Sequence, residues 1–249
     1  GAAPDRSHEQ IIKAYGMAKG FHMRAFPDIL WLEDIKKEDI PAVGGKGASL
    51  GEMASIDLPV PKAFVITASA FRNFLVETGI EERLFLELDN LDVEDSAALE
   101  KASEEAKDLI HSVGIPQKLQ QEILKAYKKL GKNAVVAVRS SATAEDLPGA
   151  SFAGQQETYL NVVGDEELLK AVQKCWASLY GGRAIYYRAR QGFDDRSVNI
   201  AVVVQELVNS EKSGVMFTSH PITGEPLTII EGSWGLGEAV VSGTVSPDK

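Results

Sequence analysis

The sequence predicts a mixed α+β fold from Phe26 onward. Short apolar runs typical of strands recur along the chain, as in the run Ile200 to Val204. Between them lie stretches with apolar residues at helical spacing, such as Leu119, Ile123 and Tyr127. With 249 residues and 44% hydrophobic content, the chain is long enough for one large domain or two smaller ones.

Local signals predict the elements of the first half. ILWLEDI (29–35) is a strand candidate, and GGKGASLGEMASI (44–56) begins as a glycine loop and continues as a helix. A strand at 64–66 is followed by Thr67 or Ser69, either of which can cap a helix at 70–75. The acidic stretch 81–108 indicates a solvated helical face, and QKLQQEILKAYKKL (117–130) an amphipathic helix.

The second half continues the same mixture. AVVAV (134–138) predicts a strand buried on both faces, ending at Arg139, and ETYLNVV (157–163) another strand. A helix then carries Cys175 and ends at Gly181 and Gly182, and a basic, aromatic helical patch follows at 183–190. NIAVVVQEL (199–207), SGVMFT (213–218) and LTIIEGS (227–233) are further strand candidates, and AVVSGTV (239–245) is strand-like.

Composition limits the classes of function. A net charge of -10 argues against binding of a nucleic-acid backbone as the main role. The apolar runs are too short to span a membrane and no signal segment is apparent, so we expect a cytoplasmic protein. The single cysteine, Cys175, excludes an internal disulfide and has the helical spacing of a buried core thiol.

The two ends differ in pattern from the rest of the chain. Residues 1–22 predict an added leader, with the native chain starting at Met23. The chain stops just after a strand-like segment, so we expect it to be truncated at the C-terminus.

Standard phosphate-binding motifs are not met. In GGKGAS, Lys46 precedes Gly47 where a P-loop has Ser or Thr, and Ile40 stands at the position of its first glycine. In GSWGLGEAV, Val240 takes the place of the last glycine of a dinucleotide fingerprint. No histidine pair has the spacing of metal ligands, and no GxSxG motif occurs.

Physical arguments nevertheless favour nucleotide binding. Glycines around Lys46 allow backbone N–H groups and the start of a helix to converge on an anion, although a turn with a solvent-exposed lysine explains the same stretch. Arg139, placed at a strand end before two serines, can hold a phosphate while the hydroxyls share the load. The alternative is an ion pair of Arg139 with Glu145 or Asp146.

Three more positions complete this set. Gly154 would let a backbone approach a ligand closely, and the Thr158 hydroxyl could reach it. Gln205, at the end of an apolar run, could read the edge of an adenine. Each of these residues alone is more often structural, but together they are the components of a nucleotide site.

Four stretches carry a resemblance to a known family. They are VGGKGASLGEM (43–53), AVRSSATAEDLPGASFAGQQETYLNV (137–162), SGVMFTSHPITGEP (213–226) and EGSWGLGEAVVSGTVSPD (231–248). Together they closely resemble the N-terminal nucleotide-binding domain of the phosphoenolpyruvate synthase (pyruvate, water dikinase) family. The resemblance covers Trp31 to Lys249 and extends to pyruvate phosphate dikinase and rifampin phosphotransferase.

The resemblance implies an ATP-grasp fold, in which two α+β subdomains flank a nucleotide cleft. Residues 23–205 would form the N-terminal part, with the lysine and arginine phosphate-binding loops, and residues 206–249 the start of an incomplete second subdomain. A histidine on a separate domain takes the β-phosphate of ATP, AMP leaves, and pyruvate on a third domain is phosphorylated. Carried over, Lys46 and Arg139 would hold ATP phosphates, Gly154 and Thr158 would lie beside the nucleotide, and Gln205 would lie at the adenine.

The same resemblance shows what the chain lacks. The phosphohistidine motif is absent, so neither His111 nor His220 takes that role, and no catalytic residue is expected here. The Mg²⁺ ligands are expected beyond the C-terminal end, and the fragment alone is expected to be inactive. The alternatives are the same domain of an antibiotic phosphotransferase or of pyruvate phosphate dikinase, and a noncatalytic adenylate-binding module.

Overall fold

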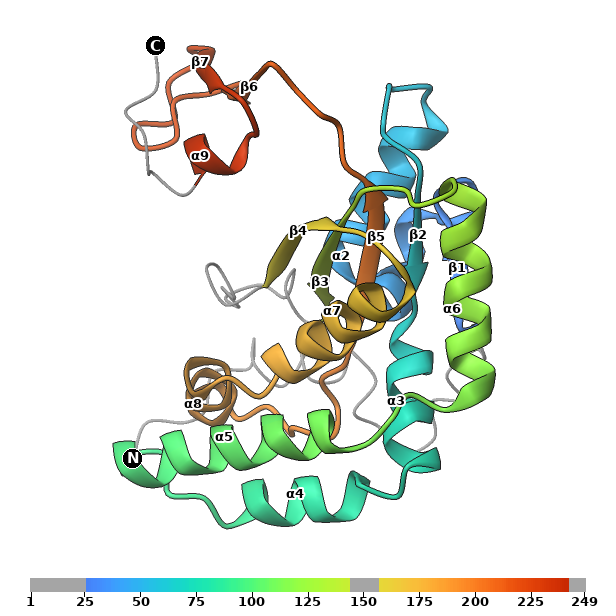
Figure 1. The fold of residues 1–249 in the computed structure, drawn as a ribbon. Helices are drawn as coiled ribbons and strands as arrows, with labels where there is room; N and C mark the ends of the chain where they lie inside the picture. Colours follow the sequence, from blue (N-terminus) through green and yellow to red (C-terminus); the bar gives the residue numbers. More distant parts are fainter. Residues whose placement is uncertain (1–25, 144–156, 242–249) are drawn as a thin grey trace. The chain divides into compact units, whose positions relative to one another are not determined.

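The computed structural model describes residues 26–143 and 157–241, and its elements are helices and strands mixed along the chain (Figure 1). The α+β class predicted from the sequence is therefore confirmed. The chain divides into two compact units, Gly1–Glu206 and Leu207–Lys249.

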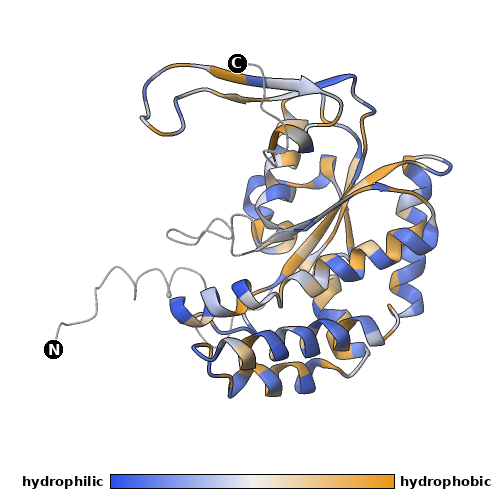
Figure 2. Cartoon of the chain, turned by 60° about the vertical axis from the view of Figure 1, so that its left-hand side comes forward, coloured by the Kyte–Doolittle hydropathy of each residue, from blue (hydrophilic) through white to orange (hydrophobic). Residues whose placement is uncertain are grey.

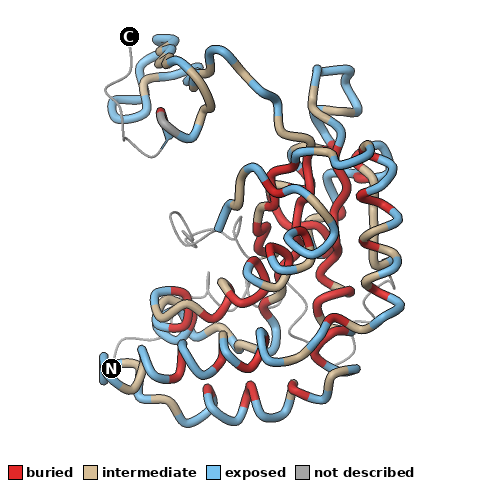
Figure 3. Tube along the Cα trace, in the orientation of Figure 1, coloured by how far each residue is buried: buried red, intermediate tan, exposed pale blue. Residues whose placement is uncertain are grey.

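The first unit contains a five-stranded sheet in which every neighbouring pair is antiparallel. Its strands, in spatial order, are β1 (Ile29–Trp31), β2 (Ala63–Ile66), β5 (Ile200–Glu206), β3 (Val136–Ala142) and β4 (Thr158–Val162). The last strand in the sequence, β5, thus lies at the centre, and all but its final residue are buried (Figure 3). Its apolar run fits this central position because both of its faces are covered.

Helices cover both faces of this sheet. They are α2 (Ile40–Ser55), α3 (Ala68–Glu77), α4 (Glu81–Asp89), α5 (Ser96–Ser112), α6 (Gln117–Leu130), α7 (Asp165–Ser178) and α8 (Gly182–Gln191), with two short 3-10 turns, Leu32–Asp34 and Lys37–Asp39. One face, with α2, forms a small core that includes Val43, Val65 and Val203. The opposite face forms a larger core with α3 to α8, in which Trp176 is fully buried.

Several local predictions are confirmed. The Thr67 side chain accepts a hydrogen bond from the Ala70 N–H, so Thr67 caps α3. The stripe Leu119, Ile123, Tyr127 and Leu130 of α6 is buried, and the amphipathic character of the helices is visible in the hydropathy colouring (Figure 2). Cys175 is buried, as its spacing predicts.

Several elements differ in type or boundary from the prediction. The helix with Cys175 ends at Ser178, and Gly181 instead precedes α8, where the Ala184 N–H donates to its carbonyl. Residues Glu238–Val241 form the short helix α9, not a strand. The strand that contains Arg139 extends to Ala142, because it continues to pair with β5 as far as Ile200.

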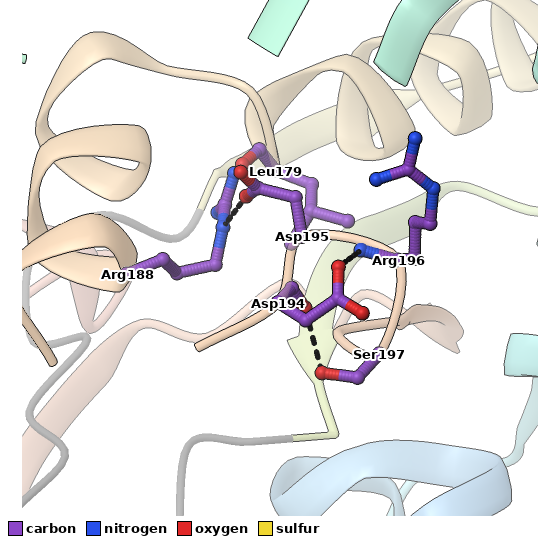
Figure 4. A network of polar contacts seen from close by, with 6 residues as sticks. All are labelled: Leu179, Arg188, Asp194, Asp195, Arg196 and Ser197. Atoms are coloured by element: carbon purple, nitrogen blue, oxygen red, sulfur yellow. Dashed lines mark hydrogen bonds and ion pairs between the residues drawn. The ribbon is translucent and has the colours of Figure 1, made fainter. Parts of the chain in front are cut away.

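The connection between α8 and β5 is held by a polar network (Figure 4). The buried Arg188 side chain donates from Nε to the Asp195 carboxylate and from Nη1 to the Leu179 carbonyl, at 2.6 Å. Two residues away, the Ser197 hydroxyl donates to the Asp194 carbonyl at 2.6 Å. Since a buried arginine is costly without its partner, this network fixes the path of the chain just before it enters the central strand.

The second unit is small. It contains the antiparallel hairpin of β6 (Lys212–Phe217) and β7 (Ile229–Trp234), followed by α9. Helix α9 contacts both strands, and Val240 is its buried apolar residue. Across the described ranges of both units, no helix is both long and apolar enough to cross a membrane.

Candidate nucleotide-binding site

Arg139 lies in the interior of β3, which corrects its predicted place at a strand end. It is opposite Thr158 of β4 on one side and Val203 of β5 on the other. The strand continues past Arg139 because Ser140 and Ser141 also pair with β5 and are buried. Residues directly opposite each other in a sheet share a face, so Arg139 and Thr158 lie on the α2 side with Val203.

Gln205 belongs to the same face. It lies opposite Ala137 of β3 and Ala63 of β2, and Ala63 belongs to the core under α2. Its side chain is largely buried, and its amide nitrogen donates to the Pro61 carbonyl at 3.3 Å. The structure therefore brings Arg139, Thr158 and Gln205 together on one face of the sheet.

The glycine stretch reaches this face through α2, which begins at Ile40, four residues before the predicted glycine loop. The helix is broken only at Gly44, where φ is 68° and ψ is 173°. That region of backbone conformation is almost restricted to glycine. A Cβ at Gly44 would also collide with the side chain and carbonyl of Ser141.

Lys46 lies two residues after this break and is half-buried near the start of the continuing helical segment 45–55. The helix is attached to β3 by Ser141, whose hydroxyl accepts from the Gly47 N–H at 3.3 Å and donates to the Val43 carbonyl at 2.8 Å. Ser141 is two residues beyond Arg139 in the strand and therefore shares its face. The two predicted phosphate-binding residues thus come from segments that contact each other directly.

Thr158 is exposed and is the first residue of β4. The residue before it, Glu157, is bound to Ser140: the Glu157 N–H donates to the Ser140 hydroxyl at 2.9 Å, and the Ser140 N–H donates to the Glu157 carbonyl at 3.0 Å. These bonds fix the point at which the chain enters the sheet beside Arg139.

Ser140 and Ser141 differ in their contacts from what the sequence led us to expect. Their hydroxyls were expected to share phosphate contacts with Arg139, but both side chains are buried and bonded within the protein. A signal was available: two adjacent hydroxyl residues in an otherwise apolar strand must find internal partners if the strand is buried. What the pattern could not reveal is the identity of those partners.

Part of the predicted site lies outside the described residues. Gly154 belongs to that part, as do Glu145 and Asp146, the proposed ion-pair partners of Arg139. Within residues 26–143 and 157–241, the structure shows no ion pair of the Arg139 guanidinium.

Burial shifts the pKa of two other titratable groups, Cys175 and His111. Burial raises the pKa of the Cys175 thiol, with a contribution from Glu157, so the thiolate is disfavoured. Burial also lowers the pKa of His111, at the end of α5, and favours its neutral form. Among the described residues, no group of His, Cys, Asp and Glu could hold a metal ion.

The arrangement can do one thing chemically. It places a lysine near the positive end of a helix segment and an arginine on the adjacent strand, with an exposed threonine hydroxyl beside the arginine. Groups of these kinds bind anions, phosphate above all. Gln205 is largely buried on the same face, two residues along β5 from Val203, the residue opposite Arg139.

Curated proteins similar to this chain carry the name phosphoenolpyruvate synthase. The chain is 58% identical over 224 residues to a probable phosphoenolpyruvate synthase of Archaeoglobus fulgidus. The matched region covers 88% of this chain and 30% of that protein. It is 49% identical over 228 residues to the phosphoenolpyruvate synthase of Aeropyrum pernix, a match that covers 89% of this chain and 28% of that protein. It is 44% identical over 263 residues to the phosphoenolpyruvate synthase of Pyrococcus furiosus, a match that covers 90% of this chain and 32% of that protein.

The chain thus spans less than a third of the length of these three curated relatives. Residues 40–249, which include all five predicted site residues, match the family described as pyruvate phosphate dikinase, AMP/ATP-binding domain. The chain therefore belongs to the pyruvate phosphate dikinase AMP/ATP-binding domain family.

Proposed function

We propose that this chain is the ATP-binding part of a phosphoenolpyruvate synthase. It would bind ATP with Mg²⁺ for transfer of the β-phosphoryl group to a histidine on another domain. The overall reaction converts pyruvate, ATP and water to phosphoenolpyruvate, AMP and phosphate. Membership of an AMP/ATP-binding family and the relatives named phosphoenolpyruvate synthase support this proposal.

The observation that most supports this proposal is the contact between α2 and β3. Ser141 joins the segment of Lys46 to the strand of Arg139 through two hydrogen bonds, and Thr158 lies opposite Arg139. Two cations held on neighbouring segments can bind the phosphates of one nucleotide, and phosphoryl transfer requires mainly such positioning and charge neutralisation.

The remaining assignments follow from the same proposal. Gln205 would lie at the adenine, and Gly154 would lie beside the nucleotide. The fold would be of the ATP-grasp type, with residues 23–205 as its first part and 206–249 as the start of the second. Residues 1–22 would be a leader. The Mg²⁺ ligands, the phosphohistidine and the pyruvate site would lie in further segments, so this chain alone would not complete the reaction.

Calorimetric titration with MgATP, on a protein of the relatives' length that carries this segment, tests the nucleotide site. We expect Lys46→Ala and Arg139→Ala each to weaken ATP binding at least tenfold, which is about 1.4 kcal/mol. Arg190→Ala is the control, because Arg190 pairs with Glu94 on an exposed surface. Affinities of both site variants equal to that of the control would refute the phosphate assignment.

A product assay tests the reaction. A protein of the relatives' length that carries this segment should, with ATP and pyruvate, release AMP and phosphate. Release of ADP alone would refute a dikinase reaction. Phosphorylation of an antibiotic with no turnover of pyruvate would identify the phosphotransferase alternative, and AMP or ATP binding without any transfer would identify a noncatalytic module.

A further inference from the structure

The Ser141 hydroxyl occupies an unusual place in α2. In an unbroken helix the Gly47 N–H would donate to the Val43 carbonyl, four residues earlier. Here the Ser141 hydroxyl accepts from that N–H at 3.3 Å and donates to that carbonyl at 2.8 Å. A side chain from a strand more than ninety residues away thus bridges the donor and the acceptor on either side of Gly44.

This bridge encloses Lys46. The three residues between the bonded groups are Gly44, Gly45 and Lys46, so the hydroxyl fixes both ends of the segment that carries the lysine. Ser141 is fully buried, and Gly44 is so close to it that no side chain fits between them. The segment therefore has little freedom to shift along β3 while both bonds are intact.

We propose that Ser141 is a positioning residue for ATP binding, which holds Lys46 at a fixed place relative to Arg139. The inference rests on the proposed function, because it assigns Lys46 and Arg139 to one nucleotide. Ser141 and Arg139 are two residues apart on one face of β3, about 7 Å along the strand. The hydroxyl that holds the lysine helix is thus attached to the same rigid strand as the arginine.

A purely structural serine would give a different result, and the chain offers a matched control. Ser103 is also fully buried, and its hydroxyl donates to the Tyr180 carbonyl at 2.8 Å, between α5 and the α7–α8 connection. Ser103→Ala removes a buried hydrogen bond away from the α2 face. If only stability mattered, Ser141→Ala and Ser103→Ala would have similar effects on ATP binding. If the position of Lys46 matters, only Ser141→Ala weakens ATP binding.

The experiment measures the MgATP affinity of a protein of the relatives' length that carries this segment. Calorimetry is done at a temperature where every variant is folded. Ser141→Ala should weaken binding about tenfold, and Ser103→Ala should leave it unchanged. Ser141→Cys keeps the size of the side chain but has a weaker donor and acceptor, so it should weaken binding to an intermediate degree. This variant keeps the test available if Ser141→Ala fails to fold.

A double-mutant cycle identifies the route of the effect. In a Lys46→Ala background, Ser141→Ala should add little further loss, because the group it positions is gone. Hydrogen exchange gives an independent readout: the Gly47 amide should lose protection in Ser141→Ala and keep it in Ser103→Ala.

The outcomes separate the inference from the proposed function. If Lys46→Ala weakens binding but Ser141→Ala does not, or if the two effects simply add, Ser141 has no positioning role and the nucleotide site stands. Unchanged protection of Gly47 in Ser141→Ala overturns the bridge itself. If Lys46→Ala and Arg139→Ala both bind ATP normally, the nucleotide site is wrong and the positioning role is overturned with it.

Discussion

Gly44 is the residue at which backbone conformation and packing restrict the sequence most tightly. Its φ of 68° and ψ of 173° suit glycine alone, and Ser141 leaves no room for a Cβ. The two restrictions are separable, because Gly164, with φ of 91° and ψ of 159°, has nothing within 4 Å of its Cβ position. Gly164 therefore reports on backbone strain without the collision.

We expect Gly44→Ala to lower the free energy of unfolding more than Gly164→Ala does. Strain at either position costs about 1–3 kcal/mol, and the collision at Gly44 adds the usual ~1–3 kcal/mol of overpacking. Urea denaturation followed by circular dichroism measures the difference. Equal losses would mean that β3 and α2 separate easily at this point, contrary to the close contact described here.

At the level of elements, an ion pair joins α4 to the segment before β5. The Arg196 guanidinium donates to both oxygens of Asp89 at 2.6 Å and lies 4.8 Å from the ring centroid of Phe85. The hydrogen bond from Arg196 lowers the pKa of Asp89. Because the carboxylate is favoured in the folded state, the pair contributes stability above the unfolded-state pKa of 3.8 and loses it as the pH falls through the lower folded-state pKa.

Asp89→Asn should therefore reduce stability at neutral pH, and its difference from the wild type should shrink below about pH 4. The effect will be small because both side chains are nearly half exposed. Urea unfolding at about pH 7 and about pH 3 measures it. Arg196→Gln is the reciprocal variant and should behave in the same way; a difference that does not change with pH would contradict the assignment.

Sequence patterns predicted the elements whose burial follows a regular period along the chain. The stripe of α6 and the apolar run of β5 were correct because burial follows directly from their periodicity. The start of α2 could not be predicted, because a helix interrupted at Gly44 is held by a serine in another element. The interior position of Arg139 was missed for a related reason: two serines extend the strand only because they find partners in α2 and at Glu157.

For the candidate site, the sequence suggested residues but not the contacts that hold them in place. Residue type and local context suggested Lys46, Arg139, Thr158 and Gln205. The structure places the last three on one face of the sheet and Lys46 on the helix that covers it. Their mutual arrangement depends on sheet register and on long-range hydrogen bonds, which local sequence does not encode. The role of each residue in ATP binding stays a prediction.

At the scale of the whole molecule, the first unit contains everything its sheet requires. All five strands and both apolar cores end before Leu207. A chain that ends at Glu206 should therefore unfold cooperatively, with a Tm within about 4 °C of that of the corresponding transition of the full chain. Differential scanning calorimetry of the two proteins makes the comparison.

The matched control is a chain that ends at Asn199 and lacks only β5 from this sheet. It should show no cooperative transition, because β2 and β3 pair with β5 and not with each other. A cooperative transition in the shorter chain, or its loss in the chain that ends at Glu206, would mean that the unit boundary does not describe how the protein folds.

The central position of β5 also has a consequence for the order of events on the ribosome. The hairpin of β3 and β4 can form early, as can the pair of β1 and β2, but the two halves are joined only by a strand about two hundred residues into the chain. Until Ile200–Glu206 leave the exit tunnel, β2 and β3 each present an unpaired edge. The nascent protein is therefore most exposed to chaperones and to misassembly just before this seven-residue strand emerges.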